Sequence, residues 1–338
     1  MANHYTRQHR RAWLLGAVLL TVFAVLAVLG LGVGSTGLES VWHMLHDPET
    51  KSMAEQIVWQ IRAPRTLGAF FAGALLGLAG AVAQGLFRNP LADPFLLGSA
   101  SGASLGVATA LALFGVSPYT KQWVVQLGLT GAAFIGAVAA VLLTLALARG
   151  VQHTLRLLLA GVVVGVVLGA ISSLISQMSP AILQIMQSFM LGSTGFVGWA
   201  ACAVMGTVLL LCLVLTWMWA RVLDGLVLGE ATAITLGLPL RTLRIALVAV
   251  LALATGTAVA QTGLIAFVGL AAPHLVRSVV KTTHDRMILL SSLMGGVLLL
   301  AADTLARGLI APQELPVGVL TAVLGGSYLL WLMHRKTL

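Results

Sequence analysis

Residue patterns that support catalysis or nucleotide hydrolysis are missing from this sequence of 338 residues. None of its eight histidines is followed by glutamate, so the zinc-binding HExxH helix of metalloproteases does not occur. The nearest approach to a GxSG nucleophile turn is Gly192-Ser193-Thr194-Gly195, which has threonine where the serine is needed. No lysine follows a glycine, although a phosphate-binding loop requires that dipeptide. We therefore predict that this chain is not an enzyme and that it holds no metal or cofactor. If ATP drives its activity, the ATP must bind to another subunit.

One acidic residue, Asp303, lies within a long apolar run at residues 287–306. Ionisable groups inside a membrane are costly and usually functional, so an ion-coupled carrier would depend on Asp303. Arg307 follows one helical turn later, in the acid-then-base order that favours a pair. We therefore expect a structural ion pair, and an ion-coupled secondary carrier remains the rival functional class.

His274 directly follows Pro273 in an apolar run and is a candidate metal ligand. Proline leaves a backbone carbonyl of its helix without a donor, and a nearby polar side chain can satisfy that carbonyl. A lone histidine in this position is more often such a hydrogen-bond donor than a ligand. We expect a structural role for His274, with iron ligation as the alternative.

The composition places these residues in a membrane protein. The chain is 59% hydrophobic and 9% charged, with mean hydropathy +1.01, whereas soluble domains carry roughly 25% charged residues. The net charge of +9 is explained by basic residues left on one side of a membrane, so no nucleic-acid partner is expected. Cys202 and Cys212 lie about 15 Å apart along one predicted helix, which is too far for a disulfide.

Apolar runs predict an all-α polytopic membrane protein that forms a single domain over residues 1–338 and crosses the bilayer ten times. Two of the runs nearly fuse into a helix of about 57 Å, far longer than a hydrocarbon core of about 30 Å, so a break is expected at Gln261-Thr262-Gly263. Residues 35–61 are predicted to form a polar segment on the outer surface, and 179–191 a short surface helix. The predicted spans are 12–34, 66–86, 95–115, 124–148, 155–177, 196–220, 243–262, 264–280, 287–306 and 316–333.

The distribution of basic residues supports this count. With both termini in the cytoplasm, fourteen of the 19 lysines and arginines lie inside, as the positive-inside rule requires. Five lie outside: Lys51, Arg62, Arg65, Lys121 and Arg307. The same topology places residues 221–244 in the cytoplasm, where another protein could reach them.

Residues 221–244 form a mixed-charge stretch between two apolar runs. They predict two short helices joined at Leu236-Gly237-Leu238-Pro239, and an ordinary interhelical loop is the alternative. Elsewhere, glycines at four-residue spacing, such as Gly73 and Gly77, predict close helix contacts. Arg65-Thr66-Leu67 and Arg241-Thr242-Leu243, five spans apart, indicate two inverted five-span halves.

Several short motifs in this sequence together resemble those of the FecCD-type permeases. These permeases are the membrane subunits of ATP-binding-cassette importers for iron-siderophores, haem and vitamin B12. The resemblance covers nearly the whole chain. It is carried by Arg62-Ala63-Pro64-Arg65, Arg88-Asn89-Pro90-Leu91-Ala92-Asp93-Pro94, Gly229-Glu230-Ala231 with Leu236-Gly237, Gly263-Leu264-Ile265-Ala266-Phe267-Val268-Gly269-Leu270, and Glu314-Leu315-Pro316-Val317-Gly318.

The resemblance implies a type II importer permease in a bacterial inner membrane. It implies a homodimer with two cytoplasmic ATPases, which bind ATP and magnesium, and one periplasmic binding protein. Asn89, Leu91 and Thr154 would close a cytoplasmic gate, and spans five and ten would line the path. Arg62, Arg65 and Arg307 would bind carboxylates of the binding protein, for which the planar guanidinium is suited. ATPase coupling would fall to Asp224, Gly229, Glu230, Ala231, Leu236, Gly237 and Leu238.

The sequence favours haem as the cargo by a small margin, with ferric siderophore and cobalamin as alternatives. The outer segment 178–190 carries Met178, Met186 and Met190, whose soft side chains would suit a large flat apolar ligand. Ordinary packing of these methionines is the other interpretation.

Overall fold

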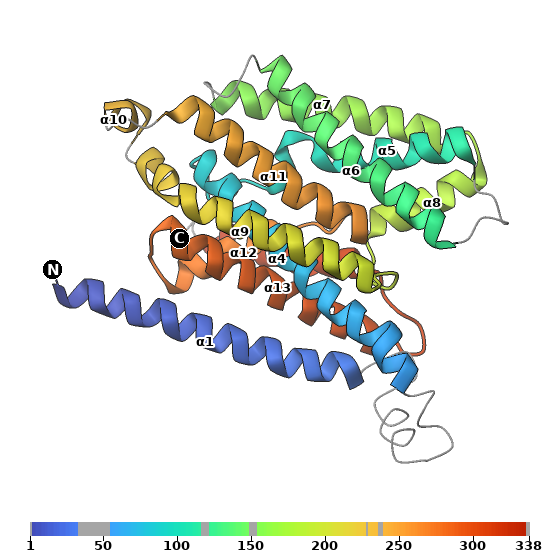
Figure 1. The fold of residues 1–338 in the computed structure, drawn as a ribbon, viewed down its shortest axis with the longest axis horizontal. Coiled ribbons are helices and arrows are strands. Elements are labelled where there is room, and N and C mark those ends of the chain that lie inside the picture. Colours follow the sequence, from blue (N-terminus) through green and yellow to red (C-terminus); the bar gives the residue numbers. More distant parts are fainter. Residues whose placement is uncertain are drawn as a thin grey trace.

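The computed structural model describes residues 2–32, 55–115, 122–148, 154–227, 229–235 and 239–335, and every regular element among them is helical (Figure 1). Long runs of Ala, Leu, Val and Gly form helices because, in lipid, each backbone N–H and C=O must find its partner within the segment. The all-α class is therefore confirmed. The helices are α1 (Ala2–Gly32), α4 (Ala63–Leu86), α5 (Ser99–Phe114), α6 (Gln122–Leu147), α7 (Thr154–Ser176), α8 (Pro180–Leu191), α9 (Trp199–Val227), α10 (Glu230–Thr235), α11 (Leu240–Thr262), α12 (Val268–Val279), α13 (His284–Gly308) and α14 (Val317–Arg335).

Seven of the described helices are long and apolar enough to cross a membrane. Predicted spans three, eight and ten correspond to the shorter helices α5, α12 and α14. Helix α5 starts late because residues Pro94–Leu97 form a 3-10 turn, η2, that ends at left-handed Gly98. Helix α12 starts late because residues 264–267 are not helical.

Two sequence predictions of helix boundaries are confirmed. Helix α11 ends at Thr262, and Gly263 has a positive φ of 68°, so the long apolar run breaks where its excess length required. The short helix predicted over 179–191 is α8, and the Ser179 hydroxyl caps it by accepting a hydrogen bond from the Ala181 N–H at 3.2 Å.

Part of the predicted surface segment 35–61 belongs to the long helical span 55–86 instead, although its residues 55–61 remain exposed or half-buried. Residues 33–54 lie outside the described part of the chain, whereas residues 55–61 continue through a π-helical turn, η1 (Val58–Arg62), into α4. As a result Arg62 and Arg65 lie within a continuous helix rather than just before its start.

Helix α4 is the centre of the bundle and is buried along nearly all its length. Its glycines bring it into backbone contact with α13, because a Cβ atom on Gly73 would lie 2.3 Å from the Gly295 carbonyl oxygen. A Cβ atom on Gly77 would lie 2.2 Å from the carbonyl oxygen of Ser291. The glycine spacing in α4 thus predicted a real helix interface. Cys202 and Cys212 are both buried and free, as expected.

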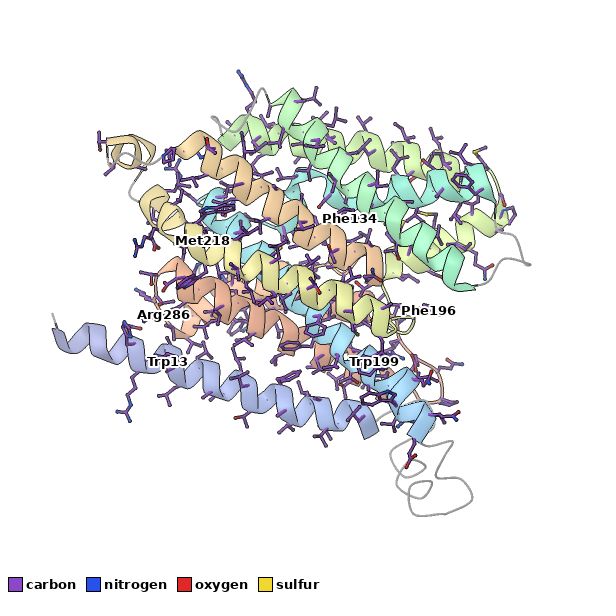
Figure 2. All side chains as sticks on the ribbon, viewed as in Figure 1. Trp13, Phe134, Phe196, Trp199, Met218 and Arg286 are labelled. Atoms are coloured by element: carbon purple, nitrogen blue, oxygen red, sulfur yellow. The ribbon has the colours of Figure 1, made fainter. Side chains whose placement is uncertain are left out.

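The bundle has two distinct ends in the view of Figure 1. Both chain termini and α10 lie toward the left end. Figure 2 places Arg286 and Trp13 toward that end, and Phe196 and Trp199 toward the other. At the right-hand end the Trp199 ring N–H donates to the Trp59 carbonyl at 2.9 Å. The polar groups discussed below fall at these two ends.

Candidate functional site

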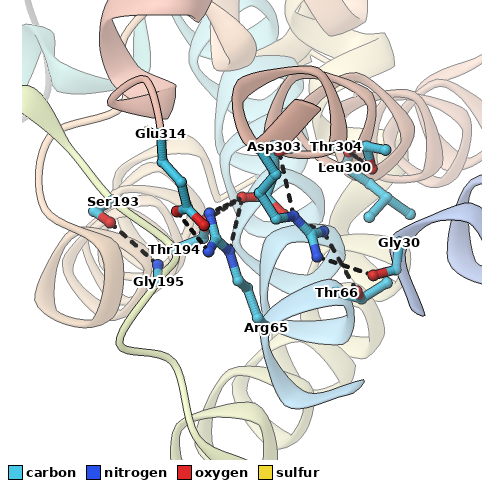
Figure 3. A network of polar contacts seen from close by, with 11 residues as sticks. Gly30, Arg65, Thr66, Ser193, Thr194, Gly195, Leu300, Asp303, Thr304 and Glu314 are labelled. Atoms are coloured by element: carbon cyan, nitrogen blue, oxygen red, sulfur yellow. Dashed lines mark hydrogen bonds and ion pairs between the residues drawn. The ribbon is translucent and has the colours of Figure 1, made fainter. Parts of the chain in front are cut away.

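A buried polar cluster at one end of the bundle is centred on Asp303 of α13 (Figure 3). The Arg65 side chain, from α4, donates two hydrogen bonds to Asp303 Oδ1, both at 3.2 Å. Arg307 Nη2 donates to Asp303 Oδ2 at 2.5 Å, and the Thr194 hydroxyl donates to Oδ1 at 2.5 Å. The expected pair between Asp303 and Arg307 is therefore confirmed, and a second arginine shares the carboxylate.

The cluster ties five parts of the chain together. Arg307 Nη1 donates to the Gly30 carbonyl of α1 at 2.9 Å. Arg65 Nη1 donates to Glu314 Oε2, in the loop before α14, at 2.8 Å. Two guanidinium groups and one carboxylate form a buried network, in which loss of any one partner would leave a buried charge uncompensated. Glu314 adds a carboxylate at its half-exposed edge.

The three arginines expected to dock a partner converge here, but their side chains are directed into the chain. Arg62, Arg65 and Arg307 are only 6%, 9% and 1% exposed. Arg62 Nη1 donates to the backbone carbonyls of Gly32 at 2.7 Å and Leu31 at 3.2 Å. Docking of a partner protein to these arginines stays a prediction, and it has to compete with the internal contacts.

Thr194 was missed as a cluster member by sequence reasoning. Its segment, Gly192-Ser193-Thr194-Gly195, drew attention only as an imperfect nucleophile turn. In the structure the Ser193 N–H donates to the Thr262 carbonyl at 2.8 Å, which holds this loop against the end of α11. Thr194 is then fully buried beside Asp303. The polar pair Ser193-Thr194 between two glycines was the signal, but the partner of Thr194 lies 109 residues away.

At the opposite end lies the stretch 221–244. Its first residues are the last turns of α9, α10 forms a separate short helix, and residues from Leu240 onward are the first turns of α11. The predicted second short helix is therefore wrong, because α11 continues without a break into the bundle. Gly229 joins α9 to α10 with a φ of 102°, a conformation for which glycine is suited. Leu236, Gly237 and Leu238 lie outside the described residues, as do the side chains of Glu230 and Ala231.

Asp224, near the end of α9, is held by a residue that the sequence did not single out. One carboxylate oxygen accepts hydrogen bonds from the backbone N–H of His284 at 3.1 Å and contacts its ring Nδ1 at 2.7 Å. Asp224 therefore caps the first turn of α13 from a different helix. Burial of this contact is partial, since the Asp224 side chain is 37% exposed and that of His284 13%.

The segment after α4 carries the predicted gate residues Asn89 and Leu91, and both are exposed. The Asn89 side-chain oxygen accepts the Leu91 N–H at 2.9 Å, and Arg88 adopts a left-handed φ of 49°. The Asp93 carboxylate accepts the Phe95 N–H at 2.8 Å, and burial raises the pKa of Asp93 above its ordinary value of 3.8. These two side-chain contacts stabilise the turn between α4 and α5.

Thr154, the third predicted gate residue, is the first residue of α7, and its side chain lies outside the described part of the structure. Helix α7 nonetheless packs on the segment after the gate turn, because a Cβ atom on Gly161 would lie 2.0 Å from the Leu96 carbonyl oxygen. The gate turn and α7 are thus neighbours through η2.

The other candidate residues differ in their exposure, and His274 is half-buried. The His274 ring contacts the Tyr328 ring of α14, with centroids 5.9 Å apart, and no cluster of three metal-ligating side chains occurs among the described residues. An apolar cavity of about 170 Å³ lies between α12, α13 and α14 and includes Tyr328 in its lining. Met178, just before α8, and Met190, within α8, are exposed, whereas Met186 of the same helix is buried.

Comparisons with known proteins agree over nearly the whole chain. The family described as the FecCD transport family matches residues 19–335. A hemin transport system permease protein, HmuU, from Yersinia pestis is 38% identical over 92% of this chain and 93% of its own length. A vitamin B12 import system permease protein, BtuC, from Shigella boydii is 39% identical over 99% of this chain and 98% of its own.

Solved structures agree with the sequence comparisons. One described as an inward-facing conformation of a metal-chelate type ABC transporter superposes with a TM-score of 0.83 and 28% identity, over 95% of this chain and 99% of that one. The PsaBC complex from Streptococcus pneumoniae shares the fold alone, with a TM-score of 0.56 and 19% identity over 78% of this chain and 88% of that one.

Proposed function

The chain belongs to the FecCD transport family, and from this premise we propose that it is the membrane-spanning permease subunit of an ATP-driven importer. It would carry an intact iron chelate, with haem favoured, from a periplasmic binding protein to the cytoplasm. The observation that carries the proposal is the family match over residues 19–335, which covers nearly all of the helices described above.

The choice of haem as cargo depends on the exposed methionines near α8. Identity does not separate haem from vitamin B12, because the hemin and B12 permeases are 38% and 39% identical to this chain. Met178 and Met190, both exposed near α8, favour a flat apolar ligand, since thioether side chains adapt to such surfaces. Ferric siderophore and cobalamin remain the alternatives within the family.

The proposed topology has ten spans with both termini in the cytoplasm of a bacterium, in its inner membrane. Seven of the described helices are long enough to cross, and α5, α12 and α14 would add three shorter crossings to make ten. An even number returns the chain to its starting side, and the two termini lie toward one end of the bundle together with α10 (Figure 1). Ten spans would also divide into the two inverted halves of five spans each that the repeated Arg-Thr-Leu tripeptide indicates.

The proposed assembly contains two copies of this permease, two ATPases and one binding protein. The ATPases would contact α10 and the neighbouring residues of the stretch 221–244, and the binding protein would approach the end that carries Arg62, Arg65 and Arg307. Asn89, Leu91 and Thr154 would close the path on the ATPase side, where the Asn89–Leu91 turn is exposed.

Reconstitution tests the function and the cargo together. The permease, its ATPase and its binding protein are placed in sealed proteoliposomes, and uptake of haem, cyanocobalamin and a ferric hydroxamate siderophore is measured with and without ATP on the ATPase side. We expect ATP-dependent uptake of haem above the other two. Uptake of cobalamin or siderophore alone would replace haem with that cargo, and absence of ATP-dependent uptake for every chelate would overturn the proposal.

A further inference from the structure

His284 occupies a junction between three helices. It is the first residue of α13, and both its backbone N–H and its ring bond Asp224 at the end of α9, 60 residues earlier in the sequence. The other edge of the ring lies against α4, because a Cβ atom on Gly85 would be 3.1 Å from His284 Nε2. The ring is thus wedged between the ends of α9 and α4.

The two neighbours of His284, Asp224 and Gly85, are each close in sequence to a segment with a proposed role, α10 and the Asn89–Leu91 turn. Asp224 lies six residues before α10, and the Gly229 N–H bonds the Leu226 carbonyl at 3.1 Å, so the end of α9 and the start of α10 are joined by a short turn. On the other side, the Gly85 carbonyl accepts the Arg88 N–H at 3.3 Å. Arg88 begins the turn that holds Asn89 and Leu91.

We infer that His284 is a positioning residue that couples the ATPase-facing helix α10 to the Asn89–Leu91 turn, acting through its contact with Asp224. This inference rests on the proposed function. A displacement of α10 moves the end of α9, and Asp224 then carries the His284 ring with it. Because the ring touches α4 beside Gly85, the start of the gate turn moves too. Glycine at position 85 leaves room for the ring, as a methyl group there would press on it.

The charge and capping at this contact explain why it can transmit a movement. An acidic side chain at the N-terminus of α13 interacts favourably with the helix dipole and with the otherwise unbonded N–H of His284. A contact that is both a cap and a side-chain hydrogen bond constrains position and direction, whereas an apolar contact allows the helices to slide.

The test measures transport per ATP hydrolysed in the full reconstituted complex. Asp224→Asn weakens the acceptor without changing its size, and His284→Gln removes the ring but keeps a polar side chain. The matched control is Asp285→Asn, which removes a carboxylate one residue away whose described bond is local, from the Thr283 hydroxyl. We expect both junction variants to lower transport per ATP roughly two- to thirtyfold while ATP hydrolysis continues, and the control to match wild type.

Two further readouts separate coupling from simple packing. The double variant Asp224→Asn/His284→Gln should be no worse than the more severe single variant, since both remove one contact. Gly85→Ala retains both Asp224 and His284 but displaces the ring, so it should lower transport per ATP in the same way. If the His284→Gln complex does not assemble, Gly85→Ala tests the inference in its place.

The inference is overturned if Gly85→Ala and the junction variants transport as efficiently as Asp285→Asn, or if the losses of the two single variants add. These outcomes differ from failure of the proposed function. In that case the wild-type complex itself would show no ATP-dependent uptake, whereas here wild type and control transport normally.

Discussion

At the scale of single residues, the two carboxylates that bind Arg65 differ sharply in environment. Asp303 is fully buried between two guanidinium groups, whereas the Glu314 side chain is 34% exposed. We expect Asp303→Asn to destabilise the protein by about 3–5 kcal/mol, since it leaves Arg65 and Arg307 facing each other without a charge between them. Glu314→Gln should cost only about 0.2–1 kcal/mol. Thermal unfolding of the two purified variants in one detergent measures the difference, and equal losses would contradict the buried network.

Glu314 also changes how docking of the binding protein should be tested. Reversal of Arg65 would disrupt Asp303 and so would not report on docking alone. If a partner carboxylate binds Arg65, then Glu314, which accepts from Arg65 Nη1 at 2.8 Å, competes with it. We therefore expect Glu314→Gln to tighten binding of the binding protein by roughly 1.5- to 5-fold.

The effect of Glu314→Gln on docking should shrink as salt rises, because exposed charges are screened over about 8 Å at physiological ionic strength. Affinity of the reconstituted complex for its binding protein, measured at low and high salt, gives the answer. Weaker binding by Glu314→Gln would show that Glu314 itself contributes to docking.

At the scale of elements, the interface between α4 and α13 depends on the absence of side chains. Gly77→Ala places a methyl carbon 2.2 Å from the Ser291 carbonyl oxygen, so the helices must separate. Overpacking of this kind costs about 1–3 kcal/mol. Gly128→Ala is the control, since nothing lies within 4 Å of the added carbon in α6. We expect a lower unfolding temperature for Gly77→Ala and an unchanged or higher one for Gly128→Ala. Equal unfolding temperatures would mean that α4 and α13 can move apart freely.

At the scale of the whole molecule, the source of energy separates an ATP-driven importer from an ion-coupled carrier. Asp303 is engaged by Arg65, Arg307 and Thr194, so its carboxylate is occupied by structural partners rather than open to a transported ion. We expect uptake in sealed vesicles to require ATP on the side of α10 and to persist when a protonophore collapses the proton gradient. Loss of uptake with the protonophore at constant ATP would favour the carrier.

The sequence by itself determined the class of protein and much of its outline. Apolar runs that exceed the membrane thickness fixed the helices and the break at Gly263, because an unbonded backbone is too costly in lipid. Short sequence motifs identified the family, and the spacing of glycines located the interface between α4 and α13. Local rules of this kind act over a few residues, so they can be read in order along the chain.

Only the tertiary structure decided which polar residues meet. Arg65 and Asp303 are 238 residues apart, and His284 and Asp224 are 60 apart, so no periodicity links them. It also decided that the predicted docking arginines are buried, because η1 extends α4 beyond its apolar run and directs Arg62 and Arg65 toward α1 and α13. Burial and pairing depend on how helices cross, and that geometry is set by the packing of the whole bundle rather than by any one segment.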